Sequence, residues 1–175
     1  MRLTNVGADT PEAYGDYLAW GETTPQASNA YNWISYKHYG GGHLTKYTGS
    51  DGLTMLEASD DPATANWGGV LRTPTADELR ELCDNCTRKW TTQNGVNGHL
   101  FTAMNGNSIF LPAAGGRRDG EFFGTGSGGV YWSSSLRADN LYDAWYFDFN
   151  SGNFGVYYSS RYKGFTVRPV CPAQN

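Results

Sequence analysis

The chain has 175 residues, a net charge of −4 and 39% hydrophobic residues. This length suits a single domain over residues 1–175 with a sizeable core, and the weak negative charge gives no footprint for nucleic acid or an anionic membrane. No apolar run approaches the about 18 residues that span a bilayer, so we expect no direct membrane insertion. The chain also begins without the apolar segment of a secretion signal, and we expect a domain cut from a longer protein.

Two helices are predicted in the first half of the chain. Residues 74–82 carry a capping box, in which Thr75 is the N-cap and Glu78 follows three residues later. A second, short helix is predicted over residues 10–17, where Thr-Pro-Glu opens the segment. Between these two, residues 31–65 are Gly-rich and polar, which is typical of a long loop pinned by its aromatic side chains.

The second half of the chain reads as short strands between Gly- and Asn-rich turns. Residues 144–150 alternate, and this pattern predicts Trp145, Phe147 and Phe149 in the core with Tyr146, Asp148 and Asn150 facing outward. Ser151–Asn153 would form a hairpin turn after this strand. The five predicted strands are Ser108–Pro112, Val130–Ser133, Ala144–Asn150, Gly155–Tyr158 and Phe165–Val170.

The segment from Tyr131 to Phe165 has the composition of a recognition surface. It holds half of the 12 tyrosines of the chain, mixed with Ser, Asn, Asp and Gly. Tyrosine offers a large amphipathic contact area at the cost of few torsions, and the small polar residues add adaptable hydrogen bonds. The composition therefore indicates binding before catalysis.

The three cysteines leave the redox state open. Cys83 and Cys86 have CxxC spacing, but one such pair is not a four-ligand zinc site, and no histidine follows at finger spacing. We expect buried thiols, or one structural disulfide with one thiol left over.

Several phrases of the chain resemble a known family. They are Tyr17–Glu22 (YLAWGE), Asn66–Gly69 (NWGG), Leu71–Thr75 (LRTPT), Phe110–Gly115 (FLPAAG), Tyr131–Ser135 (YWSSS) and Gly164–Val170 (GFTVRPV). In this order they resemble the paralogous domain first described in Fibrobacter and abundant in gut Bacteroidetes and their phages. The resemblance implies a C-type lectin fold of α+β class, with small antiparallel sheets, one or two helices and long ordered loops. It also implies the branch of that fold that includes formylglycine-generating enzymes.

That branch includes the variable proteins of diversity-generating retroelements, in which adenines of a template are randomised. Such mutation of an Asn codon AAC never yields Lys, Glu, Gln, Met or Trp. Residues 136–162 contain no Lys, Glu, Gln or Met, and their one tryptophan, Trp145, is predicted as scaffold. Strand and turn content also depletes Lys and Glu, so the absence fits both explanations. Lys163 would mark the end of a variable region.

The resemblance implies a ligand-binding protein, with no cofactor, on a cell or phage surface, attached through a segment outside this chain. Its ligand would be an unidentified protein or glycan. The candidate ligand-binding residues are Arg137, Asn140, Leu141, Tyr142, Asp143, Tyr146, Asp148, Gly155, Tyr157, Tyr158, Ser160 and Tyr162.

Two other functions remain open. An invariant carbohydrate-binding or adhesion module would use the same fold, although the usual calcium-lectin signatures are absent and we expect no bound metal. An oxidase of the formylglycine-generating type would need two cysteines in a substrate cleft, and nothing in the sequence places Cys83, Cys86 or Cys171 there. We therefore expect no enzymatic activity.

Overall fold

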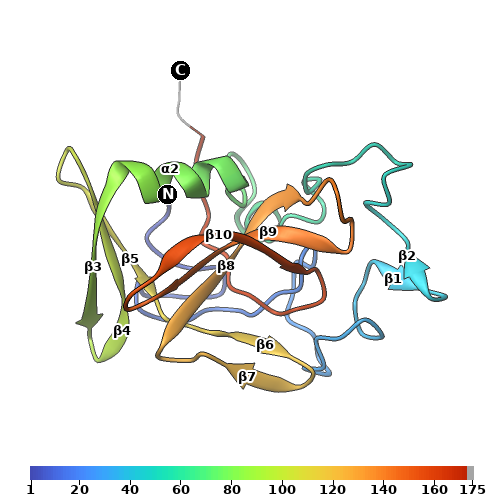
Figure 1. Ribbon diagram of the computed structural model, residues 1–175, viewed down its shortest axis with the longest axis horizontal. Helices are drawn as coiled ribbons and strands as arrows, with labels where there is room; N and C mark the ends of the chain where they lie inside the picture. Colours follow the sequence, from blue (N-terminus) through green and yellow to red (C-terminus); the bar gives the residue numbers. More distant parts are fainter. Residues whose placement is uncertain (173–175) are drawn as a thin grey trace.

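The computed structural model describes residues 1–172 as an α+β protein with small antiparallel sheets and two helices. Its central sheet has the strand order β10-β9-β8 and lies in the middle of the molecule (Figure 1). These strands are β8 (Gly128–Leu136), β9 (Asp143–Asn150) and β10 (Phe154–Ser160). The predicted strands at these places are confirmed, and the turn between β9 and β10 is capped by Asn150, whose side-chain oxygen accepts from the amides of Gly152 and Asn153.

A helix and a second sheet pack beside the central sheet. Helix α2 (Ala76–Asn85) begins at the predicted capping box, since Thr75 accepts from the amide of Glu78 and the Glu78 side chain accepts from the amide of Thr75. It lies across one edge of the molecule, next to the second sheet (Figure 1). That sheet has the order β3-β4-β5 and consists of β3 (Cys86–Gln93), β4 (Val96–Ala103) and β5 (Ser108–Pro112).

The remaining elements are short. They are β1 (Tyr39–Gly40), β2 (His43–Leu44), α1 (Pro62–Trp67), β6 (Gly116–Arg118) and β7 (Glu121–Phe123). Helix α1 was not predicted. Its N-cap is Asp61, whose carboxylate accepts from the amides of Ala63 and Thr64, and its C-cap is Gly68, with a φ of 60°. No helix in residues 1–172 is long and apolar enough to cross a bilayer.

The predicted helix over residues 10–17 is wrong. Gly15 has a φ of +74°, and a Cβ there would lie 2.3 Å from the carbonyl oxygen of Val6. The chain therefore turns at Gly15 and closes against the N-terminal segment, so that the amide of Asp16 donates to Val6. Tertiary contact at this glycine overrides the helical start signal of Thr-Pro-Glu.

The predicted strand over residues 165–170 is also only partly correct. This segment is extended and buried, but it pairs one residue at a time with three different partners. Phe165 bridges Leu18, Thr166 bridges Tyr131 and Val170 bridges Arg72. It thereby joins the N-terminal segment to the central sheet without forming a ladder of its own.

The central sheet has a hydrophobic cluster on each face, and this arrangement positions the candidate site. One cluster includes Trp132 and Phe165, whose rings stack with centroids 4.2 Å apart. The other includes Phe147, Phe149 and Leu79 of helix α2. Because both faces are packed along part of their length, an outward-facing position on β9 or β10 is exposed only beyond the edge of a cluster.

Candidate functional site

The candidate residues on β9 and β10 are divided between the two faces of the central sheet. Tyr157 pairs with Tyr146 and Gly155 pairs with Asp148 in the antiparallel register. Directly paired residues project from the same face of a sheet, whereas neighbours along a strand project from opposite faces. Tyr157 and Tyr158, which the sequence assigned to one exposed surface, therefore lie on opposite faces.

We call the first of these the Tyr157 face, defined by Tyr146, Asp148, Gly155 and Tyr157. Tyr157 is 50% exposed, and its ring centroid lies 6.5 Å from that of Tyr146. Gly155 gives the Tyr157 ring room to lie along the strand, since a Cβ at Gly155 would come within 2.8 Å of the Tyr157 hydroxyl. The four residues thus form one compact block of cross-strand neighbours.

A pocket of about 190 Å³ adjoins the Tyr157 face. It lies where the start of β8 pairs with the end of β9, and Phe123, Gly128, Gly129 and Asp148 contribute to its wall. Gly129 is required by close packing, because a Cβ there would lie 2.2 Å from the ring of Phe149. The absence of side chains at the glycines leaves the Asp148 carboxylate as the acidic group of the wall.

Burial alters the proton affinity of this face. It raises the pKa of Asp148 above its usual value, and the hydrogen bond from Tyr146 offsets this only in part. Burial also raises the pKa of Tyr146 to about 12, with a further contribution from the charge of Asp148. The Tyr146 hydroxyl donates to Asp148 over 3.4 Å, which is a long contact for two oxygen atoms.

The opposite surface, the Tyr158 face, consists of Asp143, Trp145, Tyr158 and Ser160. Tyr158 is 49% exposed, and the guanidinium of Arg137 lies 3.5 Å above its ring. Arg137 also donates to Asp143 over 3.1 Å. The charges on this face are therefore paired with one another, and the exposed tyrosine already has a cation on its ring.

Trp145 is half-buried and does not belong to the core, contrary to its prediction. It lies on the Tyr158 face beyond the hydrophobic cluster, with its ring edge-on to Tyr158 at 5.6 Å and Arg80 of helix α2 at 4.9 Å. Tyr146 is more buried than the sequence pattern predicted. Predicted as exposed, it is half-buried against Trp132 and Phe165, because the packed part of the Tyr157 face reaches it.

The remaining candidates lie around the loop after β8 and at the end of β10. Tyr142 and Tyr162 contact Trp33 edge-on, with centroids at 5.4 and 5.0 Å. Leu141 packs against the cluster that contains Trp132, and Asn140 is exposed. Trp33 is half-buried, as expected of a residue that pins the long loop over residues 31–65. These candidates form a third group beside the two faces.

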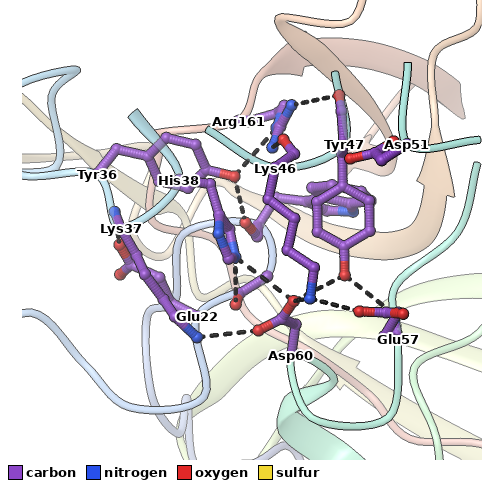
Figure 2. A network of polar contacts seen from close by, with 12 residues as sticks. Glu22, Tyr36, Lys37, His38, Lys46, Tyr47, Asp51, Glu57, Asp60 and Arg161 are labelled. Atoms are coloured by element: carbon purple, nitrogen blue, oxygen red, sulfur yellow. Dashed lines mark hydrogen bonds and ion pairs between the residues drawn. The ribbon is translucent and has the colours of Figure 1, made fainter. Parts of the chain in front are cut away.

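Arg161 is a supporting residue that sequence reasoning missed. It is fully buried at the end of β10, where it donates to Tyr36 over 3.0 Å and to the carbonyls of Lys46 and Leu141, each over 2.9 Å. Figure 2 shows it within the polar network that connects the long loop to the sheet. In the sequence it stands between Ser160 and Tyr162 in a segment that resembles a solvated turn, so no pattern distinguished it from a surface arginine.

Asp60 lies at the other side of this network (Figure 2). Its carboxylate accepts from Lys37 over 2.9 Å, from Lys46 over 2.6 Å and from Tyr47 over 2.8 Å. Burial alone would raise the pKa of Asp60, but these hydrogen bonds outweigh it and lower the pKa to about 2. The three donors all lie within residues 31–65, so the carboxylate cross-links separate segments of the long loop.

The cysteines form no disulfide in residues 1–172, and Cys83 and Cys86 are half-buried instead of buried. Cys83 lies in α2 and Cys86 begins β3. Burial raises the pKa of the Cys83 thiol to about 11, so this residue is a protonated thiol at neutral pH. Within the same residues, no group of three or more His, Cys, Asp or Glu side chains is arranged to hold a metal ion.

A family model described as Domain of unknown function (DUF8237) matches residues 86–170, slightly less than half of the chain. The match runs from the start of β3 through the central sheet to the buried segment at residues 165–170. No curated protein and no solved structure matches the chain.

Proposed function

We propose that this chain is a ligand-binding domain of C-type lectin fold, and that its Tyr157 face contacts a macromolecular ligand. The observation that carries the proposal is the arrangement of Tyr146, Asp148, Gly155 and Tyr157 as one block of paired neighbours beside a pocket. Aromatic anchors next to a concave site supply most of the energy in many interfaces. The Tyr158 face is the weaker candidate, because Arg137 already covers its tyrosine.

The proposal includes the origin of this surface. The sequence phrases that resemble the Fibrobacter-type domain surround a segment without Lys, Glu, Gln or Met, as adenine mutagenesis by a retroelement would leave it. In this proposal the sheet and its clusters are the constant scaffold, and the outward positions between residues 136 and 162 are diversified. The domain would be displayed on a cell or a virion through a segment outside this chain.

Tyr157 and Tyr158 provide a matched pair for the test, since they are adjacent, chemically identical and 50% and 49% exposed. The domain would first be screened on protein and glycan arrays, and the affinity of each Tyr-to-Ala variant for the best ligand would then be measured. We expect Tyr157→Ala to weaken binding about tenfold or more and Tyr158→Ala to change it little. Both variants should melt within a few degrees of the parent.

Three outcomes would contradict this map. A loss confined to Tyr158→Ala would move the binding surface to the opposite face. A large fall in melting temperature for Tyr157→Ala would make this residue structural. Binding to glycans that is indifferent to both variants would favour an invariant carbohydrate-binding module over a diversified receptor.

A further inference from the structure

The pocket beside the Tyr157 face has a charge that the protein itself does not balance. Asp148 is half-buried in the pocket wall, and among residues 1–172 no Lys, Arg or His forms an ion pair with it. From the described part of the chain, its side chain accepts one hydrogen bond, the long contact from Tyr146. A half-buried carboxylate without a cation is costly to the folded state, and a positively charged group would relieve that cost.

Two other buried or half-buried carboxylates, Asp143 and Asp60, do have cations from the chain. Asp143 accepts from Arg137 over 3.1 Å, and Asp60 accepts from both Lys37 and Lys46. The buried carboxylates of Asp61 and Glu22 have no ion pair within the described residues either, but each accepts several hydrogen bonds from amide or hydroxyl groups of the chain. At Asp148 the cation is missing at the point where the carboxylate borders a pocket.

Aromatic rings flank the same position. The Tyr157 hydroxyl lies over Gly155, and Gly155 is the direct cross-strand neighbour of Asp148. On the other side of the pocket, Phe123 forms part of the wall. Tyr157 is not part of the pocket wall, but its side chain lies over the cross-strand neighbour of Asp148. A cation held by Asp148 at the mouth of the pocket would therefore have a tyrosine ring beside it and gain cation–π attraction.

We propose that this pocket receives an arginine side chain of a protein ligand, whose guanidinium pairs with Asp148 and lies against the ring of Tyr157. The proposal rests on the proposed function and specifies its ligand. Guanidinium is planar, is weakly hydrated for a cation, pairs with a carboxylate through two parallel hydrogen bonds and stacks on aromatic rings. Lysine offers only a compact, strongly hydrated charge, and a neutral glycan would leave the carboxylate unbalanced.

The direct test is a titration of the 15N-labelled domain with the acetylated, amidated tripeptide Gly-Arg-Gly, followed by two-dimensional NMR. The control peptide carries citrulline, which has nearly the shape of arginine but no charge. We expect the arginine peptide to shift the amides of Gly128, Gly129 and Asp148, with an affinity at least about tenfold above that of the citrulline peptide. Equal binding of both peptides, or shifts confined to other acidic sites such as Asp77 and Asp139, would overturn the proposal.

Two variants separate the roles in the pocket. Asp148→Asn keeps the shape of the side chain and should reduce arginine binding about tenfold or more, whereas Asp77→Asn, at an exposed acid of helix α2, should leave it unchanged. Because burial raises the pKa of Asp148, binding of the arginine peptide should also be lost as the pH falls through that pKa, and this loss should be absent in Asp148→Asn. Unaltered arginine binding by Asp148→Asn would refute the pairing.

A second experiment tests the arginine pocket separately from the binding role of the Tyr157 face. Random peptides displayed on phage would be selected on the domain and then depleted on Tyr157→Ala. Tyr157-dependent peptides enriched in arginine would support the arginine pocket. Tyr157-dependent peptides without arginine would leave the binding face in place and overturn the pocket, while an absence of Tyr157-dependent peptides would contradict the proposed binding face itself.

Discussion

At the scale of single residues, the two tryptophans of the central sheet illustrate how position decides the role of a side chain. Trp132 is 1% exposed, stacks on Phe165 and donates from its ring nitrogen to the carbonyl of Leu18 over 2.8 Å. Trp145 is half-buried between Tyr158 and Arg80. The first therefore belongs to the core, whereas the second covers its edge.

We expect Trp132→Ala to lower the free energy of unfolding by about 3–5 kcal/mol, because it leaves a cavity at the centre of a cluster. Trp145→Ala should cost less than half as much, since solvent already reaches the ring and can fill the space. Urea denaturation of both variants measures the difference. Equal losses would mean that Trp145 is as well packed as the sequence pattern predicted.

The alternation of residues in the sequence predicted most of the buried side of β9 correctly and the exposed side only in part. Alternation on β9 correctly placed Phe147 and Phe149 in the core, at 0% and 1% exposure. It could not show that a second cluster lies on the other face, so it overstated the exposure of Tyr146. The same alternation, applied to the predicted strand Gly155–Tyr158, already requires Tyr157 and Tyr158 to face opposite ways, so their assignment to one surface was avoidable.

At the scale of elements, the capping box of α2 was readable because its two hydrogen bonds are local in sequence. The hairpin of β3 and β4 was equally local but was overlooked. Its signal is Asn94–Gly95, both at positive φ (48° and 82°), a dipeptide typical of a two-residue hairpin turn. The bridges of residues 165–170 could not be predicted from the sequence, since each depends on a partner far away in the chain.

A charged network around Asp60 holds the segments of the long loop over residues 31–65 together, and this gives the stability of the protein a pH dependence. The pKa of Asp60 is lowered to about 2 from 3.8. A lowered pKa means that the folded state favours the ionised form, so Asp60 stabilises the protein above about pH 4, and this contribution is lost as the pH falls toward 2.

We expect Asp60→Asn to lower the free energy of unfolding by about 2 kcal/mol at pH 7, and the deficit relative to the parent should shrink steadily below pH 4. Thermal denaturation of both proteins across the acid range measures this. Asp84→Asn, at an exposed acid of helix α2 that has no ion pair or side-chain hydrogen bond among the described residues, is the control. A deficit that stays constant down to pH 2 would mean that the network acts through shape and not through charge.

At the scale of the whole molecule, the proposed variable segment must include positions that cannot vary. Arg161 lies between two candidate ligand residues, yet it is fully buried and donates to the hydroxyl of Tyr36 and to backbone carbonyls of two separate loop segments. No other side chain carries enough donors in this planar geometry, and an unsatisfied buried carbonyl costs about 1–3 kcal/mol. The scaffold therefore constrains the diversification at this position.

Deep sequencing of the gene from a mixed natural population of its host tests this combination. We expect residues 146, 148, 155 and 157 to vary at adenine-templated codons, while the buried residues Phe147, Phe149 and Arg161 stay constant. Variation at exposed positions, with the buried positions beside them constant, is the pattern expected when a binding surface is diversified on a constant fold. Substitutions spread equally over buried and exposed positions, or an invariant segment in all copies, would contradict retroelement diversification, and the second result would leave a binding module with a single fixed ligand.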